Sequence, residues 1–176
     1  YYEGLLRDLK RMFPQVHLHA FSVPELWYLA KLEKRPLGEI IERLRGAGLD
    51  SIPGGGAEIL EDETRRRIRS RAKASTEQWL EVHEAAHGLG MRTTATMMFG
   101  VGEPVSARVE HLLAVRALQD RTGGFTAFIP WTFQPGNTPL MDEPELRAAV
   151  RAHVTATFAT GAGADRCSIY TPFSIA

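Results

Sequence analysis

Four short apolar runs, each followed by a stretch with helical spacing, organise the pattern of hydrophobic and polar positions in this chain. The runs are rich in β-branched and aromatic residues and cover residues 15–21, 49–52, 91–100 and 125–133. Apolar residues in the intervening stretches recur three or four positions apart, as in amphipathic helices. Strands that alternate with helices predict βαβ units and a parallel sheet.

The predicted helices have recognisable ends. Pro14 stops the first helix, because proline cannot continue a helix. Ser75 and Gln78 have the spacing of a capping box at the start of another. Helices are therefore predicted over residues 2–13, 36–47, 75–88 and 105–119.

Four βα units amount to about half of a (β/α)8 barrel, which needs about 200 residues or more. We expect an α/β fold over residues 1–150 that comprises the central four βα units of a TIM-type barrel, incomplete in this chain. A flavodoxin-like open sheet is the alternative. In either fold, the loops at the carboxyl ends of the strands bind ligands.

Composition narrows the functional classes. Lys plus Arg equals Asp plus Glu, at 21 each, so no global charge attracts nucleic acid. No apolar run approaches the roughly 20 residues of a spanning helix, and we expect no membrane insertion. The single cysteine, Cys167, excludes an internal disulfide and indicates a reducing, cytoplasmic location. Because Tyr1 already lies in a helical pattern, the chain is expected to be part of a longer protein.

Three consecutive glycines, Gly54, Gly55 and Gly56, follow the second apolar run. Glycine lacks a Cβ, so the backbone there can turn sharply and approach a ligand closely. Successive N–H groups could cradle phosphate. No Lys-Ser/Thr pair follows, which argues against a nucleoside-triphosphate loop. A tight strand-to-helix turn explains the glycines equally well.

His17 and His19 lie two positions apart on the first predicted strand, and their side chains therefore share one face. Two such histidines also begin the metal site of metal-dependent hydrolases, which are the alternative from another class. The strands over residues 91–99 and 125–133 carry no His, Asp or Glu. We therefore favour a ligand-facing or a hydrogen-bonded core role for both histidines and expect no metal site.

Two further patterns have ordinary explanations. His83, Glu84 and His87 match the H-E-x-x-H pattern of zinc proteases, but both histidines fall away from the centre of the buried helix face. We interpret them as an outward helix flank. Residues 65–73 form a basic run after a cluster of acidic residues. A solvated helix with local charge compensation is favoured over a phosphate or nucleic-acid site.

Gln134 and Asn137 flank a Pro-Gly turn at the carboxyl end of the last predicted strand. Their amides are placed to hydrogen-bond a polar substrate. The alternative is that they only stabilise the turn.

Three long segments, residues 48–60, 90–100 and 123–138, carry a family resemblance. Together they closely resemble cyclic dehypoxanthinyl futalosine synthases, which are radical S-adenosylmethionine enzymes of the futalosine route to menaquinone. The resemblance covers roughly residues 1–140. Aminofutalosine synthases and the FO synthase subunits share the layout and are the alternatives within this superfamily.

The resemblance implies a radical-type barrel with S-adenosylmethionine and a [4Fe–4S] cluster as cofactors. A radical from S-adenosylmethionine would abstract hydrogen from the ribose of dehypoxanthinyl futalosine, and the sugar radical would close on the benzoate ring. Residues 96–103 align with the G-x-I-x-G-x-x-E pattern that supports the adenine, although Thr96 replaces its first glycine. The implied cofactor-binding residues are Gly54, Gly55, Gly56, Glu58, Met98, Gly100 and Glu103. The implied cavity-facing residues are His17, His19, Gln134 and Asn137.

The chain departs from the family pattern in three places. The cluster is held by a Cys-x-x-x-Cys-x-x-Cys motif, which Cys167 alone cannot supply, so this chain is expected to be inactive by itself. Val101 and Gly102 stand where the family has His-Val. Residues 151–176 lack the expected apolar helix and strand, and we predict a frame-shifted or disordered tail. A non-catalytic ligand-binding fragment is a third hypothesis.

Overall fold

A small parallel sheet positions the loops of the candidate site. The computed structural model describes residues 1–68, 74–134, 144 and 171–172. Strands β1 (Ser51–Ile52), β2 (Arg92–Phe99) and β3 (Phe125–Thr132) are parallel and neighbour one another in that order. The short β4 (Thr171–Pro172) pairs antiparallel with β3. The predicted α/β class is confirmed, and the parallel units are those of a partial (β/α) barrel.

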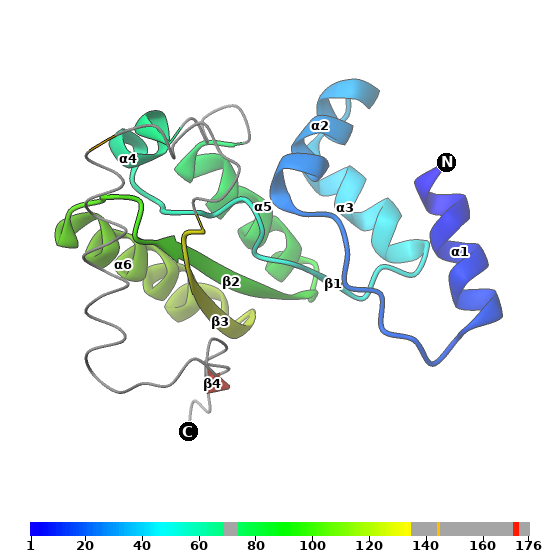
Figure 1. Cartoon of the computed structure of the whole chain (residues 1–176). Coiled ribbons are helices and arrows are strands. Elements are labelled where there is room, and N and C mark those ends of the chain that lie inside the picture. The colour runs from blue at the N-terminus through cyan, green and yellow to red at the C-terminus, as the bar shows by residue number, and fades with distance from the viewer. Residues whose placement is uncertain (69–73, 135–143, 145–170, 173–176) are drawn as a thin grey trace.

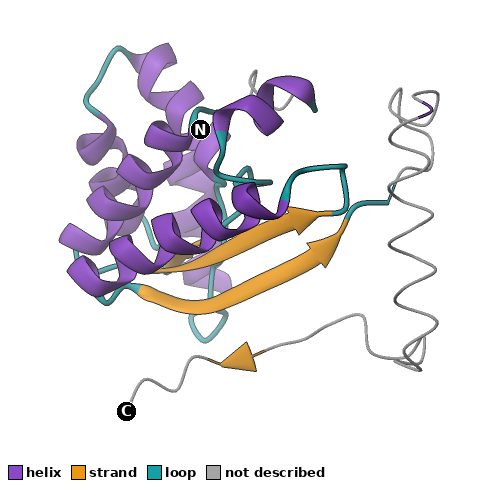
Figure 2. Cartoon of the chain, turned by 90° about the vertical axis from the view of Figure 1, so that its left-hand side faces the viewer, coloured by secondary structure: helices purple, strands orange, loops and turns teal. Residues whose placement is uncertain are grey.

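Two crossover helices cover the sheet. Helix α5 (Thr76–Gly88) leads into β2, and α6 (Val105–Thr122) connects β2 with β3. The two helices lie side by side and both pack on β2 (Figures 1 and 2). The capping box predicted for α5 is confirmed, since Gln78 N donates to Ser75 Oγ at 3.1 Å and Ser75 N donates to Gln78 Oε1 at 2.9 Å. None of the described helices is both long and apolar enough to cross a membrane.

The remaining helices extend the layer. Helices α1 (Tyr2–Met12), α2 (Val23–Glu33) and α3 (Leu37–Gly46) precede β1, and the short α4 (Asp62–Arg67) lies between β1 and α5 (Figure 1). Helices α2, α3 and α5 pack against one another. The apolar face predicted for α3 is confirmed, because its large aliphatic side chains are all buried: Leu37, Ile40, Ile41 and Leu44.

The prediction of a strand over residues 15–21 is wrong except at one residue. His19 forms an isolated parallel bridge with Ser51, and Ala20 N donates to Ser51 O at 3.2 Å. Asp50 holds the preceding turn instead, accepting from Leu18 N at 2.7 Å and from Lys10 Nζ at 2.5 Å. The segment lies at the outer edge beside β1, which is itself only two residues long, so few ladder partners are available.

The interpretation of His83 as part of an outward flank is also wrong. His83 is completely buried, with its ring centroid 4.0 Å from that of Trp79 and 5.3 Å from that of Phe125. Helix α6 and β3 cover this flank of α5, which the pattern within α5 alone could not show. Neither ring nitrogen of His83 has a hydrogen-bond partner among the described residues.

His87 does not join His83 at a metal site. Its Nδ1 lies 2.6 Å from Thr122 Oγ1 and its Nε2 lies 2.7 Å from Thr93 Oγ1, so both ring nitrogens are occupied by hydroxyls. Its ring presses on Gly124, where an added Cβ would come within 2.1 Å of the imidazole. The H-E-x-x-H pattern therefore serves packing between α5, α6 and the sheet.

These buried histidines are expected to make the fold acid-sensitive. Burial holds the pKa of His83 well below 6.5, and burial together with the charge of Arg92 lowers the pKa of His87 to about 4. The unfolded chain then binds more protons than the folded chain as pH falls from about 6.5 to about 4. The free energy of unfolding should have its full value above about pH 6.5 and should decrease as the pH falls from about 6.5 to about 4. Urea denaturation followed by circular dichroism measures this change.

A His83→Leu variant separates this effect from general acid damage. It removes two buried nitrogens that have no hydrogen-bond partner among the described residues. We therefore expect its free energy of unfolding to be about 1 kcal/mol higher than that of the wild type at neutral pH, and to fall less in acid. A wild-type stability that does not change across the window would contradict the assignment.

Candidate functional site

The loops at the carboxyl ends of the parallel strands form one rim. Residues 53–59 follow β1, residues 100–104 follow β2, and residues 133–134 follow β3. The first loop is hydrogen-bonded to the end of β2, since Met98 N donates to Glu58 O at 2.6 Å. The predicted arrangement of these segments at one edge of the sheet is therefore present.

Gly54 lies against the backbone of β2. A Cβ at this position would come within 2.7 Å of Thr94 O and 2.8 Å of the Ala95 Cα, so no other residue fits without displacing the strand. Its N donates to Thr94 Oγ1 at 3.0 Å, and its carbonyl accepts from Thr96 Oγ1 at 2.6 Å and from Trp79 Nε1 at 3.2 Å. The first glycine thus fixes the start of the loop on the sheet.

The other two glycines have different reasons to be there. Gly56 has φ +88°, and a Cβ would lie 2.8 Å from Pro24 Cδ, so both conformation and space favour glycine. Gly55 would make only an ordinary contact with the Ser22 Cβ. Glu58, with φ +44°, adopts a left-handed conformation that is uncommon for a side-chain-bearing residue, and it is 8% exposed.

The interpretation of the basic run as a solvated helix is wrong for Arg65. Its side chain, on α4, is buried, and its guanidinium donates to the carbonyls of Gly56, Ala57, Ile59 and Ala74. Burial lowers the pKa of Arg65, while the charges of Glu58 and Asp62 raise it. Arg65 therefore anchors the triple-glycine loop, whereas the next residue, Arg66, is exposed.

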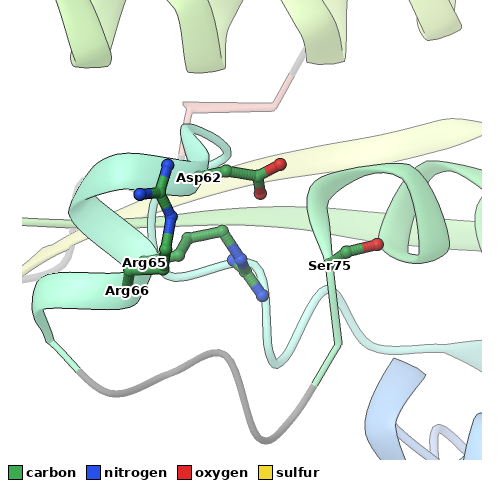
Figure 3. A pocket seen from close by; sticks show the side chains of 4 residues that line it. All are labelled: Asp62, Arg65, Arg66 and Ser75. Carbon is green, nitrogen blue, oxygen red and sulfur yellow. The ribbon is translucent and has the colours of Figure 1, made fainter.

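A cavity of about 370 Å³ opens between α4 and the start of α5. Figure 3 shows its lining of Asp62, Arg65 and Arg66 on α4 and Ser75 across the gap. Asp62 Oδ1 accepts from Thr76 Oγ1 at 2.9 Å, which ties α4 to the first turn of α5.

The turn after β2 is closed by Glu103. Its carboxylate accepts from Gly100 N at 2.9 Å, from Val101 N at 2.8 Å and from Arg108 Nε at 2.6 Å. Burial alone would raise the pKa of Glu103, but these donors outweigh it and the pKa lies below its usual value. Glu103 thus shapes the turn by binding the backbone of residues 100 and 101. Within this turn, Gly100 and Gly102 have φ +88° and +79°.

Arginines connect this turn with its surroundings. Arg67 Nη2 donates to Val101 O at 2.9 Å, so α4 holds the turn after β2 as well as the loop after β1. The Arg108 guanidinium carbon lies 5.4 Å from the ring centroid of Phe99. Met98, at the end of β2, is half-buried.

His17 and His19 meet at one hydroxyl. His17 Nε2 lies 2.7 Å and His19 Nδ1 lies 2.6 Å from Ser51 Oγ, which confirms that the two side chains share a face. Burial and the proximity of His17 lower the pKa of His19. Both imidazoles remain exposed. Within residues 1–68 and 74–134, they have no third His, Cys, Asp or Glu that would complete a metal site.

The predicted amide pair is only partly visible. Gln134 is exposed, and its Nε2 donates to Thr132 Oγ1 at 3.2 Å. Asn137, Cys167 and nearly all of the 151–176 tail lie outside the described residues.

Two buried anchors of this rim were not predicted from the sequence. Arg65 was hidden in a run of similar arginines and lysines. His111, on α6, is completely buried and accepts from Leu60 N through Nδ1 at 3.0 Å. Its pKa is lowered to about 4, mainly by burial and then by the charge of Arg65. Only the long-range contact reveals either role.

Removing the charge of Glu103 tests how the turn is held. In Glu103→Gln, an amide replaces a carboxylate that accepts from two backbone N–H groups, so hydrogen exchange at Gly100 and Val101 should accelerate about fivefold, equivalent to about 1 kcal/mol of local opening. Glu110→Gln, at an exposed position on α6, is the matched control. Equal exchange rates in the two variants would refute the role of the carboxylate.

Comparison with known proteins places the chain in a family. The family model for the radical SAM superfamily matches residues 8–115. A cyclic dehypoxanthine futalosine synthase of Halalkalibacterium halodurans is 47% identical over 146 residues, and an aminodeoxyfutalosine synthase of Thermus thermophilus is 46% identical over 143 residues. These alignments cover 83% and 81% of this chain.

A third relative has another named activity. It is a 5-amino-6-(D-ribitylamino)uracil–L-tyrosine 4-hydroxyphenyl transferase of Methanosarcina mazei, 41% identical over 80% of this chain. The aligned residues span only 39%, 38% and 37% of the three relatives, in the order named. The match to the family model nevertheless includes β1 and β2 of the parallel sheet and ends before β3. The chain belongs to the radical SAM superfamily.

Proposed function

We propose that the intact protein is a radical S-adenosylmethionine enzyme that cyclises dehypoxanthinyl futalosine in menaquinone biosynthesis. The observation that carries the proposal is the 47% identity to a relative named cyclic dehypoxanthine futalosine synthase, through the whole rim of loops. A second relative of that name, from Streptomyces coelicolor, is 46% identical over 140 residues. Since an aminodeoxyfutalosine synthase is equally similar, that reaction is the competing outcome.

The rim suits a nucleoside ligand. Gly54, Gly56, Gly100 and Gly102 lie in the two neighbouring loops after β1 and β2, and the last three have φ between +79° and +88°. The Met98–Glu58 hydrogen bond ties the first loop to the end of β2, and Arg67 binds the carbonyl of Val101 in the second. A flat ring with a polar edge can lie along such backbone. S-Adenosylmethionine, when bound, would supply hydrogen-abstracting radical chemistry at this rim.

The residues of this chain would have distinct duties. Gly54 and Gly56 let the first loop pack closely on β2 and against Pro24, Glu58 contributes a carboxylate at the rim, and Glu103 shapes the turn after β2. Gly55, Met98 and Gly100 complete the proposed cofactor-binding set. His17, His19, Gln134 and Asn137 are proposed to face dehypoxanthinyl futalosine.

The residues present do not fit the [4Fe–4S] cluster. Three thiolates are needed for a cluster that leaves one iron open, and this chain has one cysteine. The cluster is therefore proposed to be held by another part of the protein, and no step of the reaction is assigned to it here. The single cysteine also underlies the proposed cytoplasmic location.

The 176-residue chain alone is expected to form no stable cluster. After anaerobic reconstitution with iron and sulfide and removal of excess reagents, its visible absorption should lack the broad band near 400 nm, about the wavelength at which thiolate-bound iron–sulfur clusters absorb. A stoichiometric cluster in this chain would disprove the assignment of its ligands elsewhere.

The intact protein tests the reaction. With reductant, S-adenosylmethionine and dehypoxanthinyl futalosine, we expect 5′-deoxyadenosine and a cyclised product of unchanged carbon count by mass spectrometry. Glu58→Gln should lower turnover, and Glu63→Gln, exposed on α4, should not. Turnover of an aminodeoxyfutalosine synthase substrate instead would reassign the activity within the superfamily.

A further inference from the structure

Arg65 is placed where it can set the shape of the triple-glycine loop. Its side chain comes from α4, six residues beyond the loop, and is 1% exposed. Nη1 donates to the carbonyls of Ala57 and Ile59, the latter at 3.2 Å, and Nη2 donates to those of Gly56, at 3.2 Å, and Ala74. One planar group therefore grips the backbone on both sides of Glu58.

The direction of these carbonyls determines where the N–H groups point. A trans peptide is planar, with its C=O and the following N–H on opposite sides. Because the carbonyls of Gly56, Ala57 and Ile59 are directed at Arg65, the N–H groups of Ala57, Glu58 and Leu60 are directed away from it. Two of these N–H groups are paired within the protein: Ala57 N donates to Gly54 O at 3.4 Å, and Leu60 N donates to His111 Nδ1 at 3.0 Å.

The fork geometry of arginine is essential to this arrangement. A guanidinium presents five N–H donors in one plane, whereas lysine has a compact ammonium that cannot reach the same carbonyls together. The other contacts of the loop act elsewhere: Trp79 and Thr96 hold Gly54, and β2 holds the carbonyl of Glu58. Among the described contacts, Arg65 is the link that spans residues 56–59.

Glu58 needs such support because of its conformation. A left-handed φ of +44° is unfavourable for a residue with a Cβ, and it persists only where its surroundings impose it. Hydrogen bonds to the carbonyls before and after Glu58 impose it here. Loss of the guanidinium would let this residue relax towards a more common conformation.

We propose that Arg65 is a positioning residue for cofactor binding: its guanidinium holds the carbonyls of residues 56–59, and with them the left-handed conformation of Glu58 that places this residue at the S-adenosylmethionine site. The inference rests on the proposed function, because it takes the rim as the cofactor site. Arg65 itself would not touch the cofactor.

Cofactor affinity in the intact, reconstituted protein tests the inference. We expect Arg65→Lys to raise the Kd for S-adenosylmethionine at least about tenfold by isothermal titration calorimetry, because charge is kept but the bridging hydrogen bonds are lost. The matched control is Arg66→Lys, one residue along α4 and exposed, which should bind as the wild type does. Unchanged affinity in Arg65→Lys would overturn the proposal.

A second control separates positioning from general destabilisation. Ile41→Val trims a completely buried side chain on α3, away from the loop. It should lower the unfolding temperature without changing the Kd. If Ile41→Val weakens binding as much as Arg65→Lys does, the effect of Arg65 is only one of stability and the positioning role is wrong.

Hydrogen exchange of the wild type keeps the test decisive if Arg65→Lys does not fold. S-Adenosylmethionine should slow exchange at Ala57–Leu60 at least about fivefold, while residues of α1 stay unchanged. Bound cofactor without protection in this loop would overturn the inference alone. A wild type that binds no S-adenosylmethionine would overturn the proposed function as well, so the two failures are distinguishable.

Discussion

The rim depends on one close backbone contact, that of Gly54 with β2. Without a Cβ, the loop after β1 can lie directly on the neighbouring strand, where Thr94 and Thr96 hold its N–H and carbonyl. From that fixed start, the chain reaches Glu58, whose carbonyl takes the N–H of Met98 at the end of β2. The loop after β1 and the end of β2, about 40 residues apart in sequence, are thereby held together.

Helix α4 is the second determinant of this surface. It is only six residues long and its buried residues are Thr64 and Arg65, yet Arg65 and Arg67 reach the loop after β1 and the turn after β2 respectively. The guanidinium of Arg65 is enclosed by backbone carbonyls, which offset the cost of burying its charge. The short helix thus connects the loop after β1 with the turn after β2 through hydrogen bonds.

Local patterns predicted the helices, the parallel sheet and the loop positions, because periodicity and caps are properties of neighbouring residues. They failed at residues 15–21, where pairing depends on the length of β1, and at His83, where α6 and β3 supply the burial. They failed again at Arg65, since a buried arginine looks the same in sequence as its exposed neighbour Arg66. The three segments that carry the family resemblance lie at the carboxyl ends of the parallel strands, as predicted, whereas the anchors behind these loops required the tertiary contacts.

The indole of Trp79 gives this surface an optical reporter. Its Nε1 donates to Gly54 O at the start of the loop, and the ring is completely buried, whereas Trp27 is half-buried and Trp131 is exposed. The fluorescence emission of a buried indole changes when it loses such a hydrogen bond, and this change differs from that of an indole already in water. Movement of the loop can therefore be followed by intrinsic fluorescence, without a label and without turnover.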